Sequence, residues 1–347
     1  MFGLYRTMLA LMVVFHHLLL EINTGRYAVF GFYLLSGYLM TLIMHDSYGY
    51  TKAGRLKFTL NRFLRLYPTY WVACLISLFL ILFYGENLTS WYYVRMRMPT
   101  DLTDILANIT MMFPFISDTS SYIRFVDVAW SLSVEIFFYA LICIGISKTY
   151  RRVIYWLAIS LVYIFVTYMA EWSADSRYYP LAAASLPFSL GALLYFLPKT
   201  RFITGNSRAD TLATSLLFVA IFANAGFWMM FHWYNNDSWF DELGYYMNLT
   251  LCFYFVYNVV HGGKLPYISV KMDKLLGDLS YPIYLIHIQI GVIVAVYFNR
   301  LYKNDHTFYG LGAFILSTVL ILFISYLMAV LLDRPVNAIR DRIKHSK

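Results

Sequence analysis

Apolar residues recur in long runs from one end of the chain to the other, with short polar stretches between them. The runs show no strict alternation of apolar and polar residues, and most approach the roughly 20 residues that a helix needs to cross a bilayer. This pattern predicts an all-α fold, a polytopic membrane helix bundle of about ten transmembrane helices that forms a single domain over residues 1–347. The expected spans are residues 6–22, 27–44, 68–84, 125–146, 153–170, 178–197, 211–231, 244–260, 281–299 and 309–332.

The longest predicted loop, residues 85–124, contains one more apolar segment at residues 102–116. This segment is too short to cross a bilayer and contains a proline. We therefore expect it to be re-entrant or interfacial.

Composition supports a membrane protein. Of the 347 residues 60% are hydrophobic and only 13% are charged, which no soluble domain of this length shows. The net charge of +8 does not indicate nucleic-acid binding, because no polar domain is left to hold a basic patch. The expected partner is the lipid bilayer. The three cysteines all fall inside apolar runs, which argues against a disulfide framework.

The basic residues are distributed unevenly between the two sides of the predicted bundle. The side that holds both termini carries 20 of the 27 Lys and Arg residues. Because basic loops remain in the cytoplasm, the bias places both termini there and favours an even number of spans. We expect a multi-pass protein of a plasma membrane, the bacterial inner membrane.

Two ionisable residues on the first span, Arg6 and His17, are eleven residues apart. Eleven helical residues make about three turns and rise by roughly 16 Å, so the two side chains share one face. Ionisable groups inside a span are functional candidates by default. The expected orientation puts Arg6 near the cytoplasmic edge and His17 toward the outer third. The alternative is that Arg6 anchors the helix and His17 bonds a neighbouring helix.

A basic motif precedes the third span on the predicted cytoplasmic side. Arg62 and Arg65 are three residues apart and share a face if the stretch is helical. Paired guanidiniums bind phosphate oxygens through a planar fork, so the motif is a candidate phosphate site. Pro68 is expected in the first turn of the span. Contact with lipid headgroups is the alternative explanation.

The fourth span carries Ser131, Glu135 and Tyr139 at spacings of four, hence on one face. A carboxylate at this depth needs a partner. Since His17 and Glu135 lie at comparable predicted depths, Glu135 is expected to orient the imidazole and raise its basicity. A structural hydrogen bond between helices is the alternative.

Polar residues also share a face at the predicted cytoplasmic end of the ninth span, where Ser280, Tyr284 and His287 occupy positions i, i+4 and i+7. In the second span, residues 31–38 carry small residues that favour close packing between helices.

These motifs together resemble the acyltransferase-3 family of integral membrane O-acyltransferases. Arg6 and His17 fit the family's arginine, ten residues, histidine motif. GFYLLSGYLMT (31–41), NRFLRLYP (61–68), WSLSVEIFFY (130–139) and LSYPIYLIH (279–287) are similar to its later blocks, and Asp333-Arg334-Pro335 resembles its acidic-x-Pro ending. The resemblance covers nearly the whole chain.

The resemblance implies that an acyl group, most often acetyl, moves from cytoplasmic acyl-CoA to a hydroxyl of a glycan or lipid-linked sugar. No bound cofactor and no metal are expected. Arg62 and Arg65 would hold the CoA phosphates, and Arg6 would help to draw in the donor. His17 would act as a general base or carry the acyl group briefly, oriented by Glu135. The donor side would be lined by Ser131, Ser280, Tyr284 and His287.

A transporter or flippase of a lipid-linked or acylated small molecule is the alternative function. Ten spans with polar groups near the midplane fit that class as well, although the chain shows no internal repeat of the kind that transporters often carry.

Overall fold

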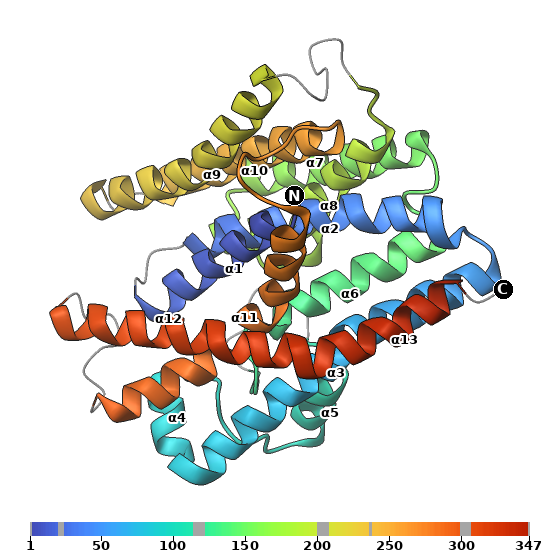
Figure 1. Ribbon diagram of the computed structural model, residues 1–347. Coiled ribbons are helices and arrows are strands. Elements are labelled where there is room, and N and C mark those ends of the chain that lie inside the picture. The colour runs from blue at the N-terminus through green and yellow to red at the C-terminus, as the bar shows by residue number, and fades with distance from the viewer. Residues whose placement is uncertain are drawn as a thin grey trace.

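The computed structural model describes residues 2–19, 24–113, 122–199, 208–235, 238–298 and 307–345, which are helical throughout most of their length and contain no strand (Figure 1). The helices are α1 (Phe2–Leu18), α2 (Thr24–Ile43), α3 (Lys52–Tyr84), α4 (Glu86–Tyr92), α5 (Leu102–Thr110), α6 (Ala129–Ile144), α7 (Tyr150–Met169), α8 (Leu181–Phe196), α9 (Arg208–Asn235), α10 (Ser238–Val260), α11 (Val270–Tyr297), α12 (Phe308–Met328) and α13 (Arg334–His345). Short π-helical turns follow α2 and α12, and a 3₁₀ turn (Ala174–Arg177) precedes α8.

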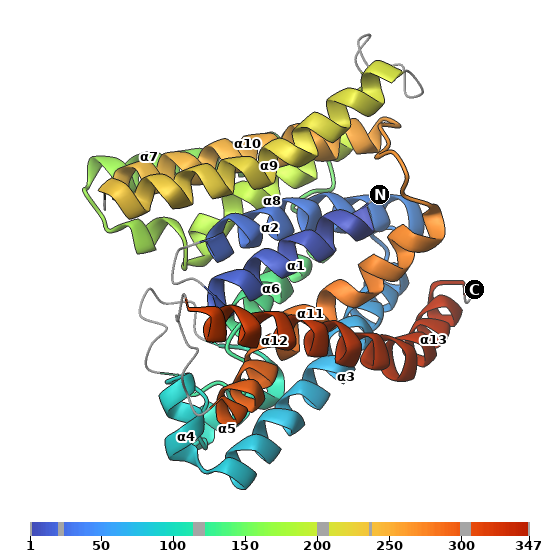
Figure 2. The same cartoon turned by 60° about the vertical axis from the view of Figure 1, so that its left-hand side comes forward.

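The long helices lie side by side in one bundle (Figure 2). Helices α1, α2 and α6 occupy the middle, between α7–α10 on one side and α3, α11 and α12 on the other. Burial differs between the helices: 89% of the apolar window of α11 and 72% of that of α2 are buried, compared with 22% for α7 and for α9. Helices α7 and α9 therefore expose apolar faces that suit contact with lipid.

Local signals set several helix ends. Thr51, Thr149, Ser269 and Thr307 each precede a helix, and each side chain accepts a hydrogen bond from a backbone N–H of the first turn. Such caps satisfy donors that the helix leaves unpaired. At the other end of α6, Gly145 adopts φ 111°, a left-handed conformation that stops the helix at little cost.

Contacts between α1 and α11 fix the register of the pair. The carboxylate of Asp273 accepts hydrogen bonds from the backbone N–H groups of Gly3 and Leu4 at 3.1 and 2.9 Å. One turn further on, the Thr7 hydroxyl donates to the Leu276 carbonyl. Gly3 and Gly277 let the two backbones touch at this point. This register decides which residues of α11 face Arg6 and His17.

Small residues also bring α2 and α8 together. A Cβ at Gly37 would collide with the backbone of Phe188, and one at Gly191 would collide with the backbone of Leu34. Close approach through glycine is typical of membrane helices, where no water drives association. The packing role expected for residues 31–38 is confirmed at Gly37.

Helices α3 and α11 begin earlier than the sequence pattern suggests. Pro68 was expected in the first turn of the third span, but α3 already begins at Lys52 and Pro68 lies inside it. Likewise α11 begins at Val270 and contains Pro282. Prolines are tolerated inside membrane helices where neighbours satisfy the freed backbone groups. The hydroxyl of Tyr281 donates to the Leu66 carbonyl at 2.8 Å and joins the two helices beside their prolines.

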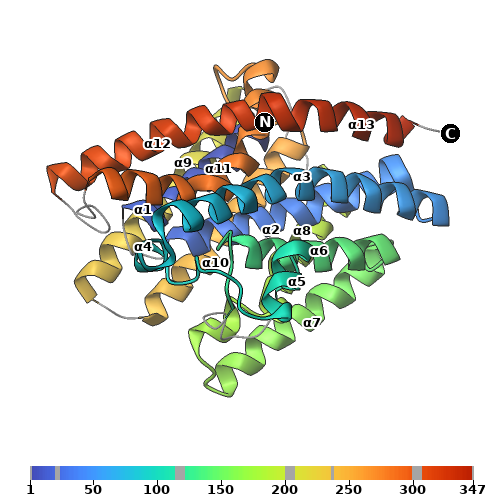
Figure 3. The same ribbon diagram turned by 90° about the horizontal axis from the view of Figure 1, so that it is seen from below.

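The apolar segment in the longest loop forms α5, which packs beside the middle of α3 (Figure 3). Side chains from α3 donate to the last carbonyls of α5: Tyr67 to Thr110, Tyr70 to Asn108 and Trp71 to Ile109, at 2.7–2.9 Å. These bonds satisfy carbonyls at the end of α5 that the helix itself leaves without donors. That this segment is re-entrant or interfacial stays a prediction.

Seven helical segments in the described part of the chain are long and apolar enough to cross a membrane, and the apolar helices α1 and α6 are shorter. The count of ten crossings stays a prediction. The two termini lie toward the same end of the bundle, which an even number of crossings requires (Figure 2). The side of the membrane on which they lie also stays a prediction.

Candidate functional site

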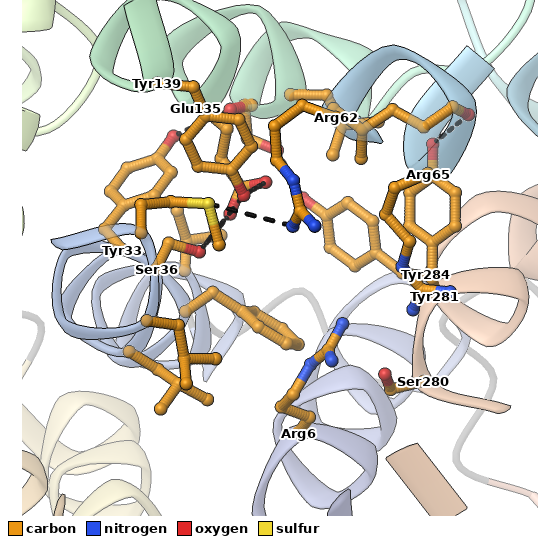
Figure 4. A pocket seen from close by; sticks show the side chains of 18 residues that line it. Arg6, Tyr33, Ser36, Arg62, Arg65, Glu135, Tyr139, Ser280, Tyr281 and Tyr284 are labelled. Atoms are coloured by element: carbon orange, nitrogen blue, oxygen red, sulfur yellow. Dashed lines mark hydrogen bonds between the residues drawn. The ribbon is translucent and has the colours of Figure 1, made fainter. Parts of the chain in front are cut away.

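Two cavities lie between the central helices. The first, which we call the arginine cavity, has a volume of about 790 Å³ (Figure 4). Helices α1, α2, α3, α6 and α11 supply its walls. Its polar lining consists of Arg6, Tyr33, Ser36, Arg62, Arg65, Ser131, Glu135, Tyr139, Ser280, Tyr281 and Tyr284.

Three guanidinium groups point into the arginine cavity, those of Arg6, Arg62 and Arg65 (Figure 4). Arg65 pairs with Asp333 at 3.6 Å, and Arg62 donates to the side-chain oxygen of Asn61 at 2.7 Å. Among the described residues, no carboxylate lies within ion-pairing distance of Arg6 or Arg62. The cavity therefore holds more positive than negative charge, which favours a polyanionic ligand.

Glu135 lies in the arginine cavity, and this corrects the expected pairing with His17. Its carboxylate accepts hydrogen bonds from Ser36 at 2.7 Å and from Tyr139 at 2.9 Å. His17 instead lines the second cavity, where its ring packs edge-on against Tyr93. Similar depth did not bring Glu135 and His17 together, because α6 turns the carboxylate toward the Arg6 end of α1.

The second cavity, which we call the histidine cavity, has a volume of about 630 Å³. It is lined by residues of α1, α2, α6 and α11, of the segments on either side of α5, and of the segment before α8. Its polar and aromatic lining consists of His16, His17, Arg26, Tyr93, Arg95, Arg124, Asp127, Trp130, Tyr178, Tyr179 and Tyr284. Both imidazoles of α1 thus reach a space that is separate from the arginine cavity.

His17 is joined to α11 by a hydrogen bond between two imidazoles. Its Nδ1 lies 2.7 Å from Nε2 of His287, and the two rings stack with centroids 5.0 Å apart. The Nδ1 of His287 lies 2.8 Å from the Tyr284 carbonyl. Because a carbonyl only accepts, His287 carries its proton on Nδ1 and accepts on Nε2. His17 must then donate from Nδ1, which leaves the lone pair of the neutral ring on Nε2.

This contact corrects the expected position of His287. It was expected on the donor side with Ser280 and Tyr284, but the structure places it against His17, outside the lining of the arginine cavity. Ser280, Ser131 and Tyr284 line the arginine cavity, and their role on the donor side stays a prediction. The fully buried His287 contacts His17 rather than the guanidiniums of that cavity.

A charged network stands beside His17 in the histidine cavity. Asp127 accepts hydrogen bonds from the Tyr93 hydroxyl at 2.8 Å and from Arg95 at 3.2 Å, and Arg124 lies 3.7 Å away. Burial acts to lower the pKa of Arg95, but the Asp127 carboxylate and Tyr93 outweigh it and raise that pKa. Burial lowers the pKa of Arg124. Tyr93 packs edge-on against His17, so one member of the network contacts this imidazole.

Tyr284 and Val29 line both cavities and form the partition between them. The Ser131 hydroxyl donates to the Val128 carbonyl at 2.8 Å, so it accepts from the Tyr284 hydroxyl at 2.6 Å. This bond ties α11 to the start of α6. A group that passes from the arginine cavity to His17 must pass Tyr284.

Comparison with known proteins decides the family. A family model described as an acyltransferase domain matches residues 3–332. The chain belongs to the acyltransferase-3 family. A search of curated proteins and a search of solved structures found no match to the chain.

Several residues of this acyltransferase's cavities were not singled out from sequence: Arg26, Tyr93, Arg95, Arg124 and Asp127. Arg26 lies in the first turn of α2, and the other four come from loops, where spacing predicts no common face. One signal was present, since three of the seven basic residues on the less basic side fall in residues 85–124. Within the described residues, no group of three or more His, Cys, Asp or Glu side chains is placed to hold a metal ion.

Proposed function

We propose that this acyltransferase moves an acyl group, acetyl in the simplest case, from cytoplasmic acyl-CoA to a hydroxyl of a glycan or lipid-linked sugar. The observation that carries the proposal is that only Tyr284 and Val29 separate a cavity lined by three guanidiniums from a cavity lined by His17. The CoA moiety carries several phosphate charges and would bind in the arginine cavity, beside Arg6, Arg62 and Arg65. The orientation predicted from the basic loops puts these residues on the cytoplasmic side.

The acceptor would enter the histidine cavity and present its hydroxyl to Nε2 of His17. As general base, His17 takes the hydroxyl proton while the acceptor oxygen attacks the thioester carbonyl. A C–O bond forms, the C–S bond breaks, and the proton passes to the departing sulfur to give free CoA. His287 accepts from Nδ1 of His17 and holds the ring in the required tautomer.

The remaining predicted residues take supporting roles. Glu135 would hold Ser36 and Tyr139 and balance part of the charge of Arg6 and Arg62 rather than orient the base. Ser131 and Tyr284 would form the passage for the acyl group, and Ser280 would line the donor site.

The proposal is tested with the purified protein in lipid nanodiscs, using radiolabelled acetyl-CoA and a glycan extract from cells that lack the protein. We expect label to move to the glycan with the wild type and not with His17→Ala. Comparing glycans from cells with and without the protein by mass then names both the acyl group and the acceptor. Label transfer that is equal for wild type and His17→Ala would overturn the mechanism.

Family membership favours the enzyme over the transporter or flippase. One assay distinguishes the two functions. Acyl transfer can be measured in nanodiscs, which enclose no second compartment, whereas transport requires two compartments. Direct transfer through a base also predicts that no labelled protein forms when the acceptor is omitted. A stable acyl-protein at His17 would instead support the acyl-carrier role.

A further inference from the structure

Helix α13 brings a further guanidinium, that of Arg340, to the arginines of α3. The Nε of Arg340 donates to the side-chain oxygen of Asn61 at 3.1 Å, and Nδ2 of Asn61 donates to the Arg340 carbonyl at 3.2 Å. Asn61 is buried, so this reciprocal pair lies at the contact between the two helices. Arg340 itself is partly exposed, and it lies outside residues 3–332 that match the family. Family membership therefore assigns it no role.

Asn61 joins Arg340 to the arginine cavity. Its side-chain oxygen also accepts from Nη2 of Arg62 at 2.7 Å, and Arg62 lines the cavity. Two guanidiniums that donate to one oxygen atom are close enough together to bind the oxygens of one phosphate group. The Nε of Arg62 is buried and has no hydrogen-bond partner among the described residues. One donor of this guanidinium is therefore unused by them.

The shared contact also brings two like charges together. Both guanidiniums are always charged, and they meet at an amide oxygen that carries only a partial negative charge. The carboxylate of Asp333, in the same region, pairs with Arg65 at 3.6 Å and accepts from Thr69 at 2.7 Å. An anion bound between Arg62 and Arg340 would replace their mutual repulsion by attraction to a common partner.

The positions of α3 and α11 show where this contact lies along the bundle. Tyr281 of α11 bonds to Leu66 of α3 at 2.8 Å, and Gln289 of α11 bonds to Ser77 of α3 at 3.0 Å. Later residues of one helix therefore meet later residues of the other, so the two helices run in the same direction. Tyr284, in the partition between the cavities, comes after Tyr281 on α11.

The contact of Arg340 is displaced from the partition in the opposite direction, because Asn61 comes before Leu66 on α3. In the proposed reaction the thioester of the donor reaches Tyr284. The 3′-phosphate of CoA is at the other end of the donor, beyond the pyrophosphate. It is also a phosphate monoester, which carries close to two negative charges at neutral pH and matches two guanidiniums.

We propose that Arg340 and Arg62 together bind the 3′-phosphate of CoA, so that the protein selects acyl-CoA over an acyl donor that lacks this phosphate. The inference rests on the proposed function and adds a residue that determines donor specificity. Arg6 and Arg65 then remain for the pyrophosphate, which lies nearer to the thioester.

Arg340 has one other possible role, the attachment of α13 to α3. In that case the Asn61 pair stabilises the fold, and Arg340 does not touch the donor. The two roles give different results with two donors. Loss of a structural contact weakens the binding of both donors equally. Loss of phosphate recognition weakens the binding of acetyl-CoA and spares acetyl-3′-dephospho-CoA.

The experiment is a calorimetric titration of these two donors into the full chain in phosphatidylcholine nanodiscs. We expect the wild type to bind acetyl-CoA about tenfold or more tightly than acetyl-3′-dephospho-CoA. Arg340→Ala should lose most of this preference, because it binds acetyl-CoA about tenfold more weakly and the analogue nearly as before. Arg340→Lys, which keeps the charge, should lose less. Arg342→Ala is the matched control, since Arg342 is an exposed arginine of the same helix.

An equal loss of affinity for both donors in Arg340→Ala, or a wild type that does not distinguish the donors, would overturn the proposal. If Arg340→Ala does not fold, Arg340→Gln gives the same comparison, because its amide can still donate to Asn61 and carries no charge. A wild type that binds neither donor would instead refute the proposed function, and this inference with it.

Discussion

The two cavities are nearly matched in charge and differ in what else they contain. Among the described residues each is lined by three guanidiniums and one carboxylate, but only the histidine cavity holds imidazoles, those of His16 and His17. Positive charge alone therefore does not distinguish the two cavities. In the proposed mechanism the imidazole of His17 assigns proton transfer to the histidine cavity and leaves anion binding to the other.

The carboxylates are also used differently. Glu135 bonds to two hydroxyls and lies beyond ion-pairing distance of Arg6 and Arg62, so it balances their charge only in part. Asp127 pairs directly with Arg95 and Arg124, at 3.2 and 3.7 Å. The arginine cavity thus suits a ligand with several negative charges, such as CoA.

The largest effect should come from His17. We expect His17→Ala to lower acyl transfer by about 10²- to 10⁴-fold, the range for loss of a general base, with acetyl-CoA binding unchanged. Transfer is followed with radiolabelled acetyl-CoA. His261→Ala is the control, because this imidazole packs edge-on against Tyr257 and lines neither cavity. Similar activity in both variants would contradict the assignment of proton transfer to His17 in the histidine cavity.

A smaller loss should follow the removal of the partner of the base. His287→Phe leaves the Nδ1–H of His17 without its acceptor, and loss of a buried hydrogen bond costs about 1–3 kcal/mol, or roughly 5- to 150-fold in kcat. His287→Asn, which can still accept a hydrogen bond, should lose less than His287→Phe. Equal rates for wild type and His287→Phe would show that the base does not depend on α11.

A substitution at Glu135 tests whether this carboxylate acts in the arginine cavity or on His17, as was expected from the sequence. Glu135→Gln removes one negative charge from the arginine cavity, so we expect tighter donor binding, by about tenfold at most, with kcat nearly unchanged. The measurement is a titration of acetyl-CoA together with initial rates. A large fall in kcat with unchanged donor binding would mean that Glu135 acts on His17 after all.

The smallest effect should come from the partition. Tyr284→Phe removes the hydrogen bond to Ser131, which is worth about 0.5–1.5 kcal/mol, or roughly two- to tenfold in a rate ratio. We expect more acetyl-CoA hydrolysis for each acyl group transferred, because water reaches the thioester through a looser partition. The ratio of released CoA to acylated acceptor measures this. A ratio equal to that of the wild type would argue against a partition at Tyr284.

The sequence predicted the helical class and much of the arginine cavity well. Arg6, Arg62, Arg65, Glu135 and Tyr284 lie on regular helices, where spacing defines a face and charge in an apolar run is conspicuous. Helix periodicity, however, says nothing about which faces meet. The register of α1 on α11, fixed by Asp273 and glycine contacts, decided that His17 meets His287 and not Glu135.

The residues that sequence reasoning missed lie where no period applies. Arg95, Arg124 and Asp127 come from one long loop and its junction with α6. Long-range bonds bring them together: Asn108 of α5 bonds to Ile123 and Phe125, and the Arg124 N–H donates to the Arg95 carbonyl. The early starts of α3 and α11 were missed because proline signals a helix start in water-soluble proteins, whereas membrane helices tolerate it in their interior.

The proposed mechanism places donor binding in the arginine cavity and proton transfer in the histidine cavity. Calorimetric titration of acetyl-CoA into the wild type, Arg62→Ala, His17→Ala and the exposed control Arg151→Ala tests it most directly. The account predicts that Arg62→Ala weakens binding by about tenfold or more, since a charge-assisted hydrogen bond is lost. It also predicts that His17→Ala and Arg151→Ala bind as the wild type does. Weakened binding in His17→Ala with normal binding in Arg62→Ala would contradict the account.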